Sequence, residues 1–409
     1  MPTVNNQQAA IVDQDKVSVI IAGKAHADWM TYQIDSDFLI PADQWSMTLG
    51  LPSGKFPADV KRGAAAQVKI GADTVMVGRI DNVQRSVARG QVALSLSGRD
   101  STAILVDCAS PVLTARQVTL EEVIAQVVRP LGITNIRLQA ESSIRNDKIT
   151  VEPGERAWDT LMRACACRGL WPWFAPDGTL IIGGPDYTTA PVATLIMRLS
   201  GKGNNLLQLS DTSSIERSFS QLTVLGQGHA HTTKKSSLAI VDVDSTAAIT
   251  VEDDTDTNDS QDSTVGTAET GFHGMKAVVS DPSISYYRPQ VLVMHDADSQ
   301  EQIQYRARKA MADARLAGYA LNATVQGHRT SDKVLWSPGQ RIHIISEPHE
   351  IDTVFFLMGR EFNRSRSGGT ITTLRLKEDG VWIPDAFPKK KKKRNAKKKK
   401  ADVRIVDVE

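Results

Sequence analysis

Two stretches near opposite ends of the chain decide the fold: TVMVGRIDNVQRS at 74–86 and TVFFLMGREFNRS at 353–365. Each follows a strand-like segment that begins just after a glycine, KRGAAAQVKIG at 61–71 and SPGQRIHII at 337–345. In both stretches an apolar strand is predicted to end in Gly-Arg. The same order of turn, strand and Gly-Arg therefore occurs twice in one chain.

A third segment completes each series, RGQVALSLSGRD at 89–100 and GGTITTLRLKED at 368–379. Both alternate apolar and polar residues, which is the period of a half-buried strand. The glycines that divide the two series are interpreted as structural turn glycines of a repeat: Gly63, Gly78, Gly90, Gly339, Gly359 and Gly369. Their spacings differ between the series by a few residues, as surface loops tolerate.

Two interpretations of this pattern are open. The first is two unrelated β-meanders that share common turn chemistry. The second, which we favour because the order recurs intact, is duplication of one module. The sequence therefore predicts an α+β fold, mainly β. It would contain two similar antiparallel barrel-like modules, a small α/β insertion between them and one long helix in the second half.

The chain divides into four predicted parts. Residues 1–110 form the first module and 111–190 the insertion, where Thr119 and Glu122 have the spacing of a capping box before a helix. Residues 191–388 form the second module, which contains an acidic Ser/Thr-rich loop at 252–265 and a helix at 299–317. Residues 389–409 form a Lys-rich flexible tail with a short terminal strand.

Charge is balanced overall but unevenly distributed. The chain has 48 Lys+Arg and 47 Asp+Glu, a formal net charge of +1. A basic run near the C-terminus contains no acid, and it is a candidate contact for a partner or a polyanion: Lys389, Lys390, Lys391, Lys392, Lys393, Arg394, Lys397, Lys398, Lys399 and Lys400. The remainder is acidic, unlike a domain that grips phosphates across one face. We interpret the run as a solvated tail.

The compartment is predicted from the cysteines and the N-terminus. Cys108, Cys165 and Cys167 are too few for a disulfide framework and fit a reducing compartment. The opening MPTVNNQQAAIVDQDK lacks a basic n-region and an apolar h-region, so no secretory signal is expected. No apolar run approaches the roughly 20 residues that cross a bilayer, so no stable membrane insertion is expected.

Motifs for nucleophilic catalysis, phosphate binding or a zinc site are weak. The segment LSLSG at 94–98 is an alternating strand end, and GKG at 201–203 does not continue into a phosphate loop. Cys165 and Cys167 lie in a predicted helix, where their side chains diverge and cannot share one metal. They are interpreted as small core residues.

Two further patterns resemble metal sites. His229 and His231 have same-face strand spacing but no carboxylate or cysteine nearby, which favours surface histidines. Asp254, Asp256 and Asn258 imitate the start of a calcium loop, but the turn glycine and the bidentate glutamate are missing. We therefore expect no enzyme, no cofactor and no metal.

The order of segments resembles a known family. It runs through VKIG…VGRIDNV, RGLWPWFAPDGTLII, IERSFSQLTVLGQG, ARLAGYALNATVQG, WSPGQRIHII and GGTITTLRLKE, over roughly residues 15–385. This order is similar to the baseplate hub proteins of contractile-tailed phages, particularly Mu-like phages. It is more distantly similar to the hub part of type VI secretion spike proteins.

The resemblance implies a virion structural protein of the tail baseplate, assembled in the bacterial host cytoplasm. Family hubs are homotrimers with two similar barrels per chain, so six barrels surround a channel through which DNA passes only in transit. One end would match the sixfold tail tube and the other a trimeric spike, with other baseplate proteins as further partners. Strand edges within 17–100 and 335–377 would make the ring contacts, with the insertion outside. No catalytic residue carries over.

Two other functions remain alternatives. One is a nucleic-acid-binding protein that acts through the basic run, with steeply salt-dependent affinity for DNA. The other is a tail-associated cell-wall-degrading enzyme. Lysine runs are not a general hub feature, and here the run is interpreted as a tether that delivers the strand-like segment 403–408 to a partner such as the spike.

Overall fold

The computed structural model describes most of the chain. Its described residues are 15–51, 55–111, 114–139, 145–151, 153–166, 170–226, 275–294, 300–365 and 368–382. Several predicted features lie outside them: Cys167, His229, His231, the acidic loop 252–265 with Asp254, Asp256 and Asn258, Ser299, and the tail 389–409 with its lysine run.

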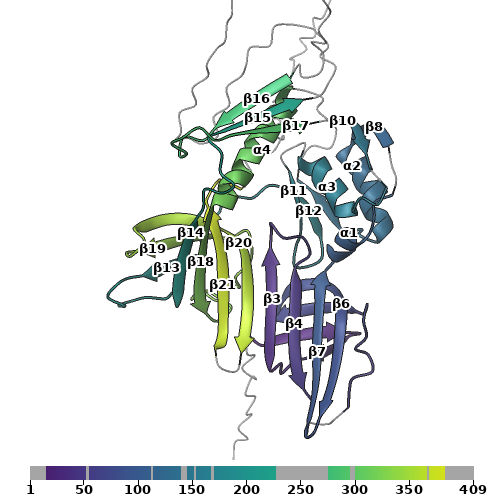
Figure 1. Ribbon diagram of the computed structural model, residues 1–409. Helices are drawn as coiled ribbons and strands as arrows, with labels where there is room; N and C mark the ends of the chain where they lie inside the picture. The colour runs from purple at the N-terminus through teal and green to yellow at the C-terminus, as the bar shows by residue number, and fades with distance from the viewer. Residues whose placement is uncertain are drawn as a thin grey trace, which may run out of the picture.

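A 13-stranded sheet dominates the described part of the chain (Figure 1). The strands of its first half are β1 (Val17–Ile21), β2 (Lys24–His26), β3 (Thr31–Asp37), β4 (Gln44–Gly50), β5 (Ala65–Ile70), β6 (Asp73–Ala88) and β7 (Gln91–Asp100). Those of its second half are β13 (Ala193–Met197), β14 (Gln208–Ser213), β18 (Tyr319–Gln326), β19 (Arg341–Ser346), β20 (Ile351–Ser365) and β21 (Gly369–Glu378). The predicted α+β, mainly β class is confirmed.

The same antiparallel pairings occur in both halves. In the first half β5 pairs with β6, β6 with β7, β7 with β4 and β4 with β3. In the second half β19 pairs with β20, β20 with β21, β21 with β18 and β18 with β14. The outer strands differ, because β1 runs antiparallel to β5 whereas β13 runs parallel to β19.

A bulge fixes how β6 and β20 correspond. The register of β6 against β7 shifts between Ile80 and Asn82, and that of β20 against β21 shifts between Leu357 and Gly359. Counted from the bulges, Asn82 occupies the place of Gly359, and the two Gly-Arg pairs are not equivalent. Both strands also continue past Gly-Arg, to Ala88 and Ser365, instead of ending there as the sequence predicted. A bulge lets a strand bend without losing its partner.

The pairings of the described strands do not close either half into the barrel that the sequence suggested. β3 pairs with β4 on one side and with β20 on the other, so the two halves join edge to edge into one open sheet. In Figure 1 β3 and β20 lie side by side at the centre of the molecule. One hydrophobic cluster contains side chains of both halves, from Val19 and Trp45 to Ile342 and Leu374.

The insertion has a core of its own. Its elements are α1 (Ala103–Asp107), β8 (Thr114–Thr119), α2 (Leu120–Val123), a π-helical turn (Ile124–Val128), a 3-10 turn (Arg129–Leu131), β9 (Ile136–Leu138), β10 (Arg145–Thr150), α3 (Ala157–Ala166), β11 (Trp171–Phe174) and β12 (Leu180–Gly183). The capping box is confirmed: the Glu122 amide donates to Thr119 Oγ1 at 3.2 Å, and the Thr119 amide donates to Glu122 Oε2 at 2.7 Å. Buried Leu105, Leu161 and Cys165 belong to this core.

A smaller sheet interrupts the second half between β14 and β18. It consists of β15 (Gln221–Gly226), β16 (Met275–Ser280) and β17 (Pro289–Met294), and α4 (Gln300–Gly318) covers one face. The long helix expected at 299–317 is therefore present. Lys377 of β21 donates to the carbonyl oxygens of Leu316 and Tyr319 at the C-terminal end of α4. A positive charge at this end complements the helix dipole.

Candidate functional site

The site that the fold singles out is the junction, defined here as the β3–β20 pairing and the side chains around it. Paired residues run from Asp37 opposite Gly359 to Tyr32 opposite Arg364, and the Phe38 amide donates to Met358 O at 3.0 Å. Backbone hydrogen bonds therefore fix the register between segments more than three hundred residues apart in sequence.

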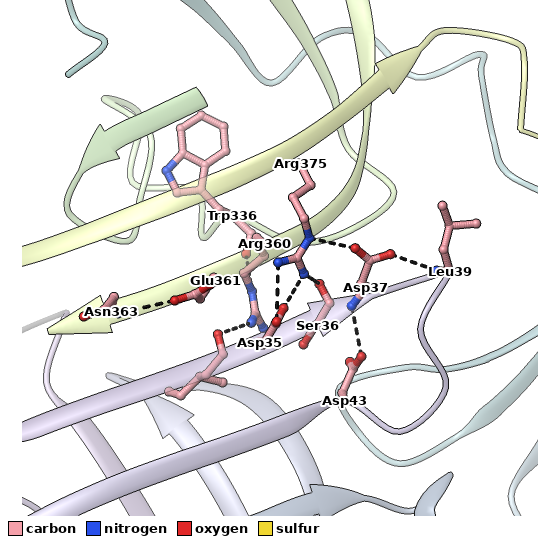
Figure 2. A network of polar contacts seen from close by, with 11 residues as sticks. Asp35, Ser36, Asp37, Leu39, Asp43, Trp336, Arg360, Glu361, Asn363 and Arg375 are labelled. Atoms are coloured by element: carbon pink, nitrogen blue, oxygen red, sulfur yellow. Dashed lines mark hydrogen bonds and ion pairs between the residues drawn. The ribbon is translucent and has the colours of Figure 1, made fainter. Parts of the chain in front are cut away.

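Arg375 of β21 crosses the junction to two carboxylates of β3 (Figure 2). Its Nε donates to Asp37 Oδ2 at 2.7 Å, and its Nη2 donates to Asp35 Oδ1 and, at 3.3 Å, to Ser36 O. Because all three groups are largely shielded from water, these charge-assisted bonds are stronger than surface ion pairs.

Gly359 makes room for these ion pairs. A Cβ at this position would lie 2.4 Å from Asp37 Oδ2 and 2.8 Å from Arg375 Nη2. Any side chain at this position would therefore push the carboxylate and the guanidinium apart. This role differs from the turn role that the sequence suggested for the same glycine.

Arg360 lies beneath the network and is 1% exposed. Its Nε and Nη1 donate at 3.3 Å to the carbonyl oxygens of Trp336 and Ile34, one from each half of the sheet. Its guanidinium also lies 4.0 Å from the centre of the Phe362 ring. Burial lowers the pKa of Arg360 to about 10, against the opposing effect of Asp43 and Asp35.

The carboxyl groups of buried Asp100 and half-buried Asp43, both in the first half, face the same region. The Asp100 amide donates to Asp43 O at 2.9 Å, and Asp43 Oδ1 accepts from the Asp37 amide at 2.9 Å. Burial raises the pKa of both groups, and the neighbouring Asp43 raises that of Asp100 further. Both line a cavity of about 250 Å³, together with Trp158 and Trp173 of the insertion.

A neutral histidine forms a second bridge across the junction. Thr372 Oγ1 donates to Gly327 O at 2.6 Å, so it can only accept from His328 Nδ1, 3.0 Å away. His328 Nε2 must then accept from the Tyr32 hydroxyl at 2.8 Å. Burial lowers the pKa of His328 to about 3, with nearby Arg360 acting in the same direction, which keeps the ring uncharged.

An aromatic cluster joins the insertion to the junction. The Trp171 Nε1–H donates to Phe38 O at 2.7 Å. The Phe38 ring stacks on Trp382 with centroids 4.9 Å apart, and Trp171 meets Trp382 edge-on at 5.9 Å. Buried Phe356 of β20 completes the contact. Both halves and the insertion therefore pack on one another at a single place.

The predicted repeat glycines fall into two groups. Gly63, Gly90, Gly339 and Gly369 have φ of 78°, 78°, 93° and 69°, the left-handed conformation of turn glycines. The turns correspond, because Gly63 donates to Ile80 O at 2.7 Å and Gly339 donates to Leu357 O at 2.8 Å. Gly78 lies inside β6 instead, where a Cβ would be 1.9 Å from Arg99 O.

The charged residues of the junction were not predicted from the sequence. Arg360 was noted only as part of a Gly-Arg pair, and nothing in the sequence relates Asp35 or Asp37 to Arg375. Their shared signal is weak: two acids in an otherwise alternating strand, where an exposed face explains them equally well.

The polar groups of the junction bind parts of the chain to one another. Its arginines are bound to carboxylates and carbonyl groups, and no group of three or more His, Cys, Asp or Glu in the described ranges could hold a metal ion. Within the same ranges, no helix has the length and hydropathy to cross a membrane. The arrangement holds two sheet halves and an insertion in fixed positions.

Four family models match successive parts of the chain. Residues 16–100 match the N-terminal domain of the Mu phage baseplate assembly protein GpP-like family, and 102–184 match the second domain of gp44-like baseplate hub proteins. Residues 261–311 match the third domain of NMB1110-like tail proteins, and 313–381 match their C-terminal domain.

Solved and curated relatives agree. The tail protein from Neisseria meningitidis MC58 is 37% identical, with a TM-score of 0.73 over 91% of this chain and 99% of that one. The 43 kDa tail protein of prophage MuSo2 from Shewanella oneidensis is 21% identical, with a TM-score of 0.69 over 90% and 99%. Baseplate hub protein gp44 of Escherichia phage Mu is 22% identical over 343 residues, 83% of this chain and 81% of gp44.

Fold and relatives together define a structural protein of a phage tail. The chain belongs to the family of baseplate hub proteins of Mu-like phages. The resemblance inferred from the sequence is thereby confirmed, and the protein is a component of the tail baseplate.

Proposed function

We propose that three copies of this chain form a ring in which each copy supplies two similar β modules. The observation that carries the proposal is the recurrence of the same antiparallel pairings, with matching bulges and turns, in both halves of the sheet. Closed rings need repeated equivalent surfaces. Two modules per chain give a threefold ring six similar positions, which suits a sixfold tube at one end and a trimeric spike at the other.

The division of labour follows the cores. We propose that 1–110 and 191–388 supply the ring modules and that 111–190, together with α1, which packs into the core of the insertion, lies outside the ring. The junction would let this arrangement transmit force between the two modules of one chain. Arg375, Arg360 and His328 bind the halves together through buried polar contacts, so a load on one half passes to the other. Spike, tail tube and other baseplate proteins would be the partners, and DNA would only pass through the channel.

Assembly of this virion component would take place in the host cytoplasm, and the tail 389–409 would act as a tether to the spike. Deleting 389–409 should then weaken spike attachment while leaving the ring intact.

The two alternatives, a nucleic-acid-binding protein and a cell-wall-degrading enzyme, are not favoured, because the relatives are structural tail proteins.

Mass in solution combined with negative-stain imaging tests the ring. The full chain would be measured alone and after co-expression with the trimeric spike protein of the same tail. We expect particles of three chains with a central channel in at least the second preparation. Particles with one chain per spike subunit but no ring, or a monomer in both preparations, would contradict the proposal.

A further inference from the structure

Two corresponding strands, β3 of the first half and β14 of the second, differ in how many neighbouring strands they have. β3 lies between β4 and β20, whereas its counterpart β14 pairs with β18 alone among the strands that the structure describes. The Ser214 amide donates to Gly318 O at 2.7 Å, in register with the β14–β18 pairing. Because backbone groups alternate along an antiparallel strand, the N–H and C=O groups of Leu209, Asp211 and Ser213 face the open edge.

The part of β6 beyond its bulge corresponds to the part of β20 that pairs with β3. This part of β6 also has an open strand edge. Beyond its bulge, β6 pairs only with β7 among the described strands, and β5 ends its pairing at Arg79. Residues 84–88 are all exposed, and Val87 is 72% exposed. An exposed strand of this length with an unpaired edge is a template for another strand.

We propose that β14 of one copy pairs antiparallel with residues 82–87 of a second copy, repeating between chains the β3–β20 pairing within the chain. This inference rests on the proposed ring and specifies the surface that closes it. Transferring the β3–β20 register through the matching strands gives one register between copies. It places Val83 opposite Ser213, Arg85 opposite Asp211 and Val87 opposite Leu209.

The side chains at these positions are complementary. In the junction the corresponding pair is Phe362 opposite Ile34, both fully buried and apolar. Between copies the same place holds Arg85 opposite Asp211, an oppositely charged pair at cross-strand distance. Among the residues that the structure describes, Arg85 contacts the Val60 carbonyl oxygen, at 2.7 Å, and the Phe56 ring.

The neighbouring positions and the symmetry of the contact support the same pairing. Exposed Val87 would cover Leu209, which adds apolar contact beside the charges. The two surfaces differ, so the contact is heterologous and generates a closed ring when the rotation between copies is correct. The β3–β20 pairing within each chain supplies the alternate contacts of that ring.

Charge reversal tests the pairing in the full-length chain. Asp211→Arg and Arg85→Asp should each lower the trimer fraction at least tenfold in analytical ultracentrifugation, and the double variant should restore it. Asp159→Arg, a reversal on an exposed residue of α3, is the matched control and should leave the trimer unchanged. Circular dichroism of each variant verifies that it is folded. Folded single variants with wild-type trimer fractions would overturn the pairing.

Cysteine cross-linking tests the register independently. A mixture of Val83→Cys chains and Ser213→Cys chains should form a disulfide-linked pair, because opposed residues of a hydrogen-bonded pair have Cα atoms about 5.5 Å apart. Val87→Cys mixed with Ser213→Cys places the thiols about 13 Å apart along the strand and should not link. Trimers without the expected cross-link would leave the ring standing and refute the pairing. Monomers without any cross-link, with and without the spike, would refute both.

Discussion

The two halves of the sheet share their pairings but differ in what surrounds one strand. In the first half β3 is enclosed by β4 and β20, and its inward residues Tyr32 and Ile34 are buried. In the second half β14 has one neighbour among the described strands, and five of its six residues, all except Leu209, are exposed. The strand pairings are common to both halves. The side chains differ, and they decide which strand edges are paired within one chain.

The charges of the junction are not repeated. Counted from the bulges, Val83 occupies the place of Arg360, and Ser97 occupies the place of Arg375. The contact within the chain therefore uses buried Arg360 and half-buried Arg375, whereas the open edge of the first half presents Arg85 to solvent. This difference suits a permanent contact on one side and a contact made during assembly on the other.

Arg360→Ala should produce the largest loss of stability. The substitution removes the guanidinium that donates to two buried carbonyl oxygens, and it takes a positive charge away from Asp43, whereas Asp35 keeps its ion pair with Arg375. Breaking a buried charge network costs about 3–5 kcal/mol. The measurement is the free energy of unfolding in urea, at a concentration where the chain is monomeric. The matched variant Val83→Ala, at the corresponding open position, should cost about 1 kcal/mol or less. Equal losses would contradict the comparison.

The pH dependence of stability should come next in size. Burial raises the pKa of Asp43 to about 7 from an unfolded value of 3.8. The folded state thus holds this proton more tightly, so the contribution is complete below about pH 4 and is lost as pH rises through 7. Asp43→Asn removes it. The unfolding free energy of the variant relative to wild type should rise by roughly 2–4 kcal/mol between pH 4 and pH 8.

Urea titrations at four pH values measure that difference, and Asp159→Asn in the insertion is the matched control for an exposed acid. A relative stability of Asp43→Asn that stays constant over this range would show that Asp43 titrates normally in the folded chain. The same titration on Asp100→Asn separates the two carboxyl groups, because the proximity of Asp43 raises the pKa of Asp100.

Local patterns in the sequence predicted much of the frame. The alternation at 89–100 predicted the strand that β7 forms, the Thr119 capping box predicted α2, and the turn glycines marked corresponding hairpins. Each of these signals depends on neighbouring residues, so one sequence is enough to reveal it. The order of segments along the chain was enough to suggest the family.

The junction could not be predicted, because it depends on residues far apart in the chain. Which strand borders β3 is decided by edges that only meet in three dimensions, and the open sheet that results differs from the barrel-like modules that were expected. The Gly-Arg alignment was also misleading. A bulge adds one residue to a strand and leaves no sequence signal of its own, so the correspondence of Gly359 with Asn82 needed the register.

Gly359→Ala should cost less than the loss of Arg360. The new methyl group would displace Asp37 or Arg375 and weaken their ion pair, whereas the surrounding backbone can stay in place. Overpacking of this kind typically costs about 1–3 kcal/mol. Asn82→Ala, at the bulge-matched position of the first half, should change the unfolding free energy by about 0.5 kcal/mol or less. If Asn82→Ala were as costly as Gly359→Ala, the corrected alignment would not explain why a glycine is needed on one side alone.

Asp352→Ala should have the smallest effect, although it also removes a polar side-chain contact in the second half. Asp352 Oδ1 lies 2.7 Å from His343 Nε2 across the β19–β20 hairpin, but its side chain is 73% exposed. Water and salt screen such a pair, which is worth about 0.5 kcal/mol or less. Unfolding free energies of Asp352→Ala and Arg360→Ala at low and high salt separate the two cases. The small cost of Asp352→Ala should vanish in high salt, whereas the cost of Arg360→Ala should persist. The difference is expected because burial, and not charge alone, determines how strongly the halves are held. A comparable cost for both variants would remove burial as the reason that the junction is strong.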